Sequence, residues 1–114
     1  MSAVALISDL FFVSKVKGTA DAIGVPLKTV RTLTDLNAAL DAGAKLAIVD
    51  MNVTGVDPAE AVRACKAAPA PPFVIAYLSH VQADLALAAQ EAGADLVLPR
   101  SKFSADLPNL LQRL

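Results

Sequence analysis

Short apolar runs alternate with segments of helical period five times along the chain. The apolar runs cover 3–7, 25–31, 46–50, 73–77 and 96–98. The run 46–50 is apolar up to its last residue, which is typical of a central parallel strand covered on both faces. The run 25–31 is more polar and begins near Pro26, which favours an edge strand. Each apolar run is therefore predicted to be a strand.

The segments between these runs carry helix signals. In the first, an apolar face repeats every three or four residues until Gly24; its members are Phe12, Val16, Ala20 and Ile23. Thr34 is predicted to cap a short second helix that ends near Leu40.

The third helix has the strongest start signal. Asp57 is predicted as its N-cap, Pro58 as its first residue and Glu60 as the partner in a capping box, with an end near Ala68.

For the fourth helix, Ser79 and Gln82 form a capping-box pattern, and an apolar stripe ends at Gly93. The last helix is predicted from leucines, with Pro108 in its first turn; they are Leu107, Leu110, Leu111 and Leu114.

Alternating strands and helices predict an α/β fold, a doubly wound parallel sheet with helices on both faces. The 114 residues suit a single domain, 1–114, which we expect to stand alone.

Composition excludes several classes of function. The net charge is −1 with no lysine or arginine cluster, so a nucleic-acid footprint is not expected. No apolar run approaches the ~20 residues of a membrane span, and the start lacks a basic leader. The single Cys65 suits a reducing cytoplasm, and one histidine and one cysteine argue against a zinc site.

Two acids stand at predicted strand ends, Asp9 after the first strand and Asp50 closing the third. Ligands collect at the carboxyl ends of such strands. If the strand order is 2-1-3-4-5, these carboxylates converge, and a hard cation such as Mg²⁺ would neutralise them. Asn52 could add a backbone carbonyl.

The stretches VALISDL, LAIVDMNVTGVDP and GADLVLPR carry a resemblance that covers essentially the whole chain. They resemble the receiver domains of bacterial two-component response regulators. The resemblance implies a flavodoxin-like (βα)5 fold with the order 2-1-3-4-5. It implies Asp50 as phosphoacceptor, with Asp9, Asp50 and the Asn52 carbonyl on Mg²⁺. It also implies a histidine kinase or phosphotransfer protein as partner.

The chain departs from the receiver pattern at several positions. Ser8 stands where the family has a second acid, Leu78 at its hydroxyl position and Val97 at its switch aromatic. Arg100 replaces a lysine and could pair with a phosphoryl oxygen or with Asp50. A one-residue deletion in the fourth helix would bring Ser79 to the hydroxyl position.

Simpler roles stay open for the same residues. Asp9 could be an ordinary loop residue, Ser79 a helix cap, and His80 either a titrating neighbour of the site or a surface residue. Leu10, Phe11 and Phe12 place three apolar residues together at the rim of the site, and the first helix's apolar face needs only Phe12 of them. A contact surface is therefore expected at these three residues.

Three functions follow from these patterns. The first is a phosphorylatable receiver in a phosphorelay, which is not an enzyme in its own right. The second is a pseudo-receiver, a phosphorylation-independent interaction module that acts in trans or as a homodimer. The third is a haloacid-dehalogenase-like phosphatase, because VDMNVT has part of that motif. Asn52 then stands at the general-acid position, where an amide cannot transfer a proton.

Overall fold

A parallel sheet of five strands in the order β2-β1-β3-β4-β5 forms the centre of the molecule. The computed structural model describes residues 2–79 and 82–113. The strands in this part are β1 (Ala3–Leu6), β2 (Leu27–Val30), β3 (Leu46–Asp50), β4 (Phe73–Leu78) and β5 (Leu96–Pro99). The expected fold class, strand order, central β3 and edge strand β2 are confirmed.

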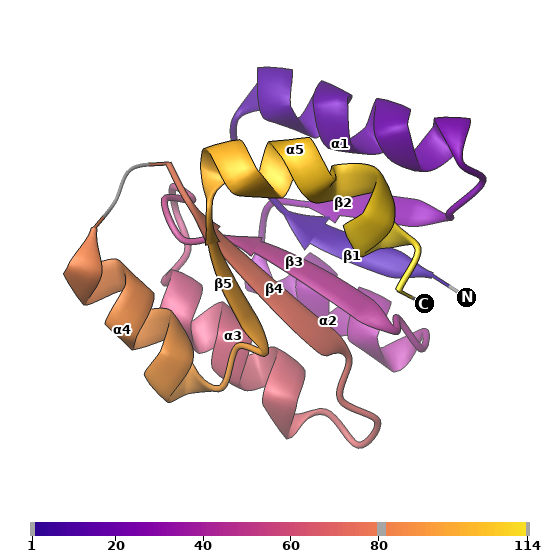
Figure 1. Ribbon diagram of the computed structural model, residues 1–114. Helices are drawn as coiled ribbons and strands as arrows, with labels where there is room; N and C mark the ends of the chain where they lie inside the picture. The colour runs from indigo at the N-terminus through magenta and orange to yellow at the C-terminus, as the bar shows by residue number, and fades with distance from the viewer. Residues whose placement is uncertain (1, 80–81, 114) are drawn as a thin grey trace.

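Helices cover both faces of the sheet (Figure 1). Those in the described residues are α1 (Leu10–Ala22), α2 (Leu33–Asp41), α3 (Pro58–Ala67), α4 (Ala83–Ala92) and α5 (Arg100–Leu111). The helices α1 and α5 pack on one face, around Phe12, Phe103 and Leu107. The helices α2, α3 and α4 pack on the other, around Leu36, Val62 and Ala89. None of the described helices is long and apolar enough to cross a bilayer.

Local signals account for several helix ends. Asp57 caps α3 as predicted, with Pro58 in the first turn, and its carboxylate accepts a hydrogen bond from the N–H of Ala59 over 3.0 Å. The predicted capping box was wrong, because the bond goes to Ala59 and Glu60 makes no hydrogen bond to Asp57 in the described structure. The helix α1 shows the expected buried face of Phe12, Val16 and Ala20.

Two predicted helix starts were wrong. The N-cap of α2 is Thr32, whose hydroxyl accepts from the N–H of Asp35 over 3.1 Å, so Thr34 lies inside the helix. The helix α4 begins at Ala83 rather than after Ser79. Asn52 binds the two groups that the predicted capping box needs: the Ser79 N–H and the Gln82 side chain.

The last helix was predicted too short. It begins at Arg100, directly after β5, so Pro108 lies in its interior and not in its first turn. Phe103 and Leu107 are buried together, which extends the predicted leucine face by one turn.

Candidate functional site

The residues of interest gather at the carboxyl ends of the strands. Asp50 is the last residue of β3 and lies in register with Tyr77 of β4. Asp9 is the N-cap of α1, just after β1, and Arg100 is the first residue of α5, just after β5. The sheet therefore brings together groups that are far apart in the sequence, as the crossover connections of a parallel sheet allow.

Asp50 is a buried carboxylate. Its residue is 5% exposed, and no other charged residue is buried in the described part of the chain. One oxygen, Oδ1, accepts the N–H of Asn52 over 2.8 Å. Burial raises the pKa of the Asp50 carboxyl, while the Asn52 N–H and the nearby Arg100 charge act in the opposite direction. The Asp50 carboxylate is thus buried, and the charge of the Arg100 guanidinium lies nearby.

Asp9 has both carboxylate oxygens engaged. Oδ1 accepts the N–H groups of Phe11 and Phe12 over 3.0 and 3.3 Å, and Oδ2 accepts from Arg100 over 3.1 Å. The Phe12 N–H, followed by the Arg100 guanidinium, lowers the pKa of Asp9. Asp9 is therefore both a helix cap and half of an ion pair.

Arg100 is fixed between Asp9 and an aromatic ring. Its guanidinium carbon lies 4.3 Å from the centroid of the Phe12 ring, in cation–π geometry. The expectation that Arg100 pairs with Asp50 was wrong, because its ion pair in the described structure is with Asp9. Asp50 experiences the guanidinium only as a nearby charge.

The Asn52 side chain is turned toward the β4–α4 loop. Its amide oxygen accepts the N–H of Ser79 over 2.8 Å, and its amide nitrogen donates to the Gln82 side chain over 2.9 Å. The N–H of Thr54 donates to the Ser8 hydroxyl over 3.2 Å. Asn52 and Ser8 thus connect the three loops that follow β1, β3 and β4.

Tyr77 was not predicted as a site residue, although its ring lies on the same face of the sheet as Asp50. It is 1% exposed, and its hydroxyl makes no hydrogen bond with any described residue. Burial, and then the Asp50 carboxylate, raise the pKa of the Tyr77 phenol. The alternation of 73–77 separates its faces, but only the β3–β4 register shows that Tyr77 lies beside Asp50.

Other predicted positions lie elsewhere. Leu78 is buried on the face covered by α2, α3 and α4, and Val97 packs against the same cluster. Neither side chain shares a face with Asp50. Ser79 is half-buried in the loop after β4. His80 lies outside the described residues.

The described residues hold no cluster of three or more His, Cys, Asp or Glu side chains that could bind a metal. The expected set for Mg²⁺ is smaller, with the carboxylates of Asp9 and Asp50 and the Asn52 carbonyl. In this arrangement Arg100 already pairs with Asp9. A divalent cation at Asp9 would therefore compete with the Arg100 guanidinium for this carboxylate.

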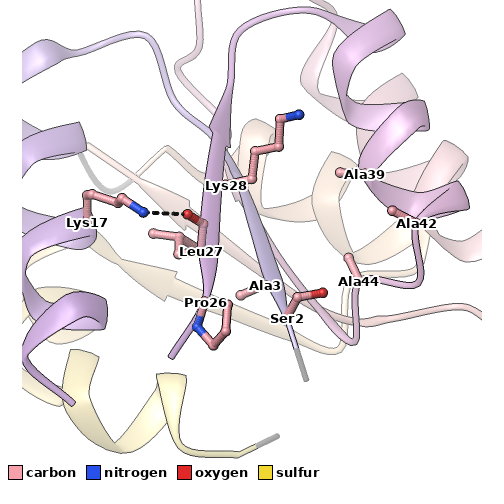
Figure 2. A pocket seen from close by; sticks show the side chains of 9 residues that line it. All are labelled: Ser2, Ala3, Lys17, Pro26, Leu27, Lys28, Ala39, Ala42 and Ala44. Carbon is pink, nitrogen blue, oxygen red and sulfur yellow. Dashed lines mark hydrogen bonds between the residues drawn. The ribbon is translucent and has the colours of Figure 1, made fainter. Parts of the chain in front are cut away.

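A cavity of about 340 Å³ lies at the opposite end of the strands, around the start of β2 (Figure 2). Its lining includes Pro26, Leu27 and Ala39. Lys17 donates to the Leu27 carbonyl over 2.8 Å on one side of β2, and Lys28 points to the other side. The cavity is mainly apolar and separate from Asp50.

No protein-family model matches the chain, and no curated relative matches it. Solved structures do. The signal receiver domain of a DNA-binding response regulator from Colwellia psychrerythraea 34H matches with a TM-score of 0.80 and 16% identity, over 99% of both chains. The BeF3-activated DrrB receiver domain matches with a TM-score of 0.74 and 21% identity, also over 99% of both.

A response regulator from Burkholderia pseudomallei, solved with a phosphorylated aspartic acid, calcium and citrate, matches with a TM-score of 0.81 and 14% identity. The match covers 98% of this chain and 66% of that one. These likenesses establish that the chain has the receiver-domain fold.

Proposed function

We propose that this chain, which has the receiver fold, is a signalling domain of a two-component system in which Asp50 accepts a phosphoryl group. The observation that carries the proposal is the Asp50 carboxylate, which is buried at the end of the central strand with the Arg100 guanidinium nearby. Two of the matched solved structures support it, since one carries a phosphorylated aspartic acid and the other is BeF3-activated.

The donor would be a phosphohistidine on a histidine kinase or phosphotransfer protein. An Asp50 carboxylate oxygen forms a bond to phosphorus while the bond from phosphorus to the imidazole nitrogen breaks. The electron pair of the broken bond stays on that nitrogen, which then takes a proton from solvent. Asp50 has to be ionised for this attack, so the acyl-phosphate is formed only where the carboxyl has lost its proton.

Charge has to be offset when a phosphoryl group meets two carboxylates. Arg100 cannot be neutralised and lies near both acids. Asp9, Asp50 and the Asn52 carbonyl would hold a divalent cation, which stabilises the negative charge of a transferred phosphoryl group when bound. Asp9 would also orient the start of α1 through its two backbone N–H bonds.

Acetyl phosphate with Mg²⁺ tests the proposal without knowledge of the partner. Intact-mass analysis should find one phosphoryl group on the wild-type chain and none on Asp50→Asn. Asp57→Asn is the matched control, because Asp57 is an acid near the same loop that caps α3; this variant should still be phosphorylated. A wild-type chain that gains no mass under conditions that phosphorylate a known receiver would refute the proposal.

The second candidate is a phosphorylation-independent interaction module. The Asp9–Arg100 pair favours it, because it neutralises Asp9 without any added cation. The mass experiment separates the two candidates, since the module predicts no adduct. A haloacid-dehalogenase-like mechanism gains no support, because the Asn52 side chain is bonded to the β4–α4 loop.

A further inference from the structure

The hydroxyl of Tyr77 is a buried donor that makes no hydrogen bond of good geometry, although it lies close enough to the Asp50 carboxylate to interact with it. Tyr77 is the sole tyrosine in the sequence and is 1% exposed. Its oxygen is the one buried side-chain polar atom in the described residues that makes no hydrogen bond. Such an atom costs free energy, which a phenylalanine at the same place would avoid. An acceptor bound beside this hydroxyl would remove that cost.

The surroundings of the ring fix the direction of this donor. The Tyr77 ring stacks on Phe103 of α5 with centroids 4.6 Å apart and planes 13° from parallel. Phe12 of α1 contacts it at 5.0 Å. With its ring held between two helices, the phenol cannot turn toward solvent without disturbing the core of this face.

Tyr77 lies next to Asp50 in the sheet. The two residues are partners in the β3–β4 register and lie on the same face of the sheet. The Tyr77 ring belongs to the buried cluster on this face, so its hydroxyl is held close to the Asp50 side chain. A neutral donor is thus fixed beside the carboxylate proposed to carry the phosphoryl group.

We propose that the Tyr77 hydroxyl donates a hydrogen bond to an oxygen of the tetrahedral anion carried on Asp50. The inference rests on the proposed function and names the group that stabilises its product. The sequence resemblance directs attention to Leu78 or Ser79 for a hydroxyl. Leu78 lies on the opposite face of the sheet, and the Ser79 N–H is bonded to Asn52.

The sole tyrosine also provides the test. Because the sequence has no tryptophan, the near-ultraviolet absorption and the intrinsic fluorescence of the protein report chiefly on Tyr77. Beryllofluoride with Mg²⁺ serves as the phosphoryl mimic. Its binding to the wild-type chain should shift the tyrosine absorption band to longer wavelength, as a phenol does when it donates to an anion. Asp50→Asn should show no shift.

Two variants distinguish Tyr77 from Ser79 as the hydrogen-bond donor. Tyr77→Phe keeps the ring and removes only the oxygen, and a hydrogen bond to a charged group predicts beryllofluoride binding weaker by about tenfold or more, measured by ¹⁹F NMR. Ser79→Ala, the matched loss of a hydroxyl, should bind as the wild type does. The melting temperature of Tyr77→Phe should equal or exceed that of the wild type, since the wild-type hydroxyl is buried without a hydrogen bond of good geometry.

The outcomes distinguish this inference from the proposed function. If neither acetyl phosphate nor beryllofluoride modifies Asp50, the proposed function fails and the inference fails with it. If an adduct forms while the tyrosine band stays in place and Tyr77→Phe binds as the wild type does, the inference alone is overturned. Weaker binding confined to Ser79→Ala would assign the donor to Ser79 and also overturn it.

Discussion

Arg100 donates a hydrogen bond to the carboxylate of Asp9 over 3.1 Å, across a separation of 91 residues in the sequence. The pair connects the start of α5 to the start of α1 at the open end of the sheet. It occupies the carboxylate oxygen that a divalent cation at Asp9 would also use. A cation that binds Asp9 would therefore have to compete with the Arg100 guanidinium for the carboxylate.

Arg100→Gln should strengthen the binding of a divalent cation. A partly exposed ion pair contributes up to about 1 kcal/mol, so removing the competing guanidinium should tighten binding roughly twofold to fivefold. Paramagnetic broadening by Mn²⁺ in NMR spectra, read at the amides of Asp9 and Asn52, measures this without any phosphoryl transfer.

Arg113→Gln is the matched control for this experiment. Arg113 also lies over an aromatic ring, with its guanidinium carbon 4.1 Å from the Phe73 centroid, but outside the site. Its loss should leave the Mn²⁺ affinity unchanged. Weaker Mn²⁺ binding in Arg100→Gln would contradict the competition and would mean that the guanidinium helps to organise the site.

Asp50→Asn should stabilise the folded protein at neutral pH. Burial raises the pKa of Asp50 in the folded state, so ionised Asp50 opposes folding once the pH exceeds that pKa. Below the unfolded pKa of about 3.9 the carboxyl is protonated in both states, and the advantage of the amide should vanish. Urea unfolding of both proteins across this pH range measures the difference. A gap that is constant with pH would show that Asp50 ionisation carries no such cost.

Phe11 and Phe12 are neighbours with opposite expected effects. Phe12 is 4% exposed and contacts Tyr77 and Phe103, so Phe12→Ser should cost at least about 3 kcal/mol. Phe11 is 90% exposed, and Phe11→Ser should change stability by no more than about 0.5 kcal/mol. Urea unfolding gives both values, and a large loss in Phe11→Ser would place its ring in the core.

The contact surface expected at Leu10, Phe11 and Phe12 remains a prediction for its first two residues, whose side chains are exposed as it requires. Its third residue was wrong, because Phe12 is buried in the core. If this surface joins two copies of the chain, sedimentation should show self-association in the wild type and less of it in Phe11→Ser. Leu87→Ser is a suitable control, because Leu87 is an exposed leucine on α4, on the other side of the sheet. An equal loss of self-association in both variants would indicate non-specific hydrophobic association and not a specific surface.

The sequence predicted the fold well where the signals are local. The capped start at Asp57 and Pro58, the buried face of α1 and the apolar β3 depend on neighbouring residues, and all three were correct. The capping-box pattern at Ser79 failed for a long-range reason, because Asn52 bonds to the Ser79 N–H and the Gln82 side chain.

The sequence also placed two candidate site residues. The rule that ligands collect at strand ends selected Asp9 and Asp50, and both lie at the carboxyl ends of their strands. Their roles in a site stay predictions. The pairing of Arg100 with Asp9 and the approach of Tyr77 to Asp50 depend on register and on side-chain direction across the sheet. Spacing along the chain carries no information on either, so a buried aromatic within a predicted strand gave no sign of its place in the site.

The sheet separates two layers of helices, and the cluster of rings formed by Phe12, Tyr77 and Phe103 lies wholly on the side of α1 and α5. On that side, Tyr77 is both a core residue and the neighbour of Asp50 in the sheet. A substitution in this part of the core therefore affects the stability of the fold and the surroundings of Asp50 together. On the side of α2, α3 and α4 the core is aliphatic, and α4 is connected to the candidate site through its N-cap Gln82, which binds Asn52. Substitutions on the exposed sides of these helices can therefore change which surfaces the protein presents without altering the residues around Asp50.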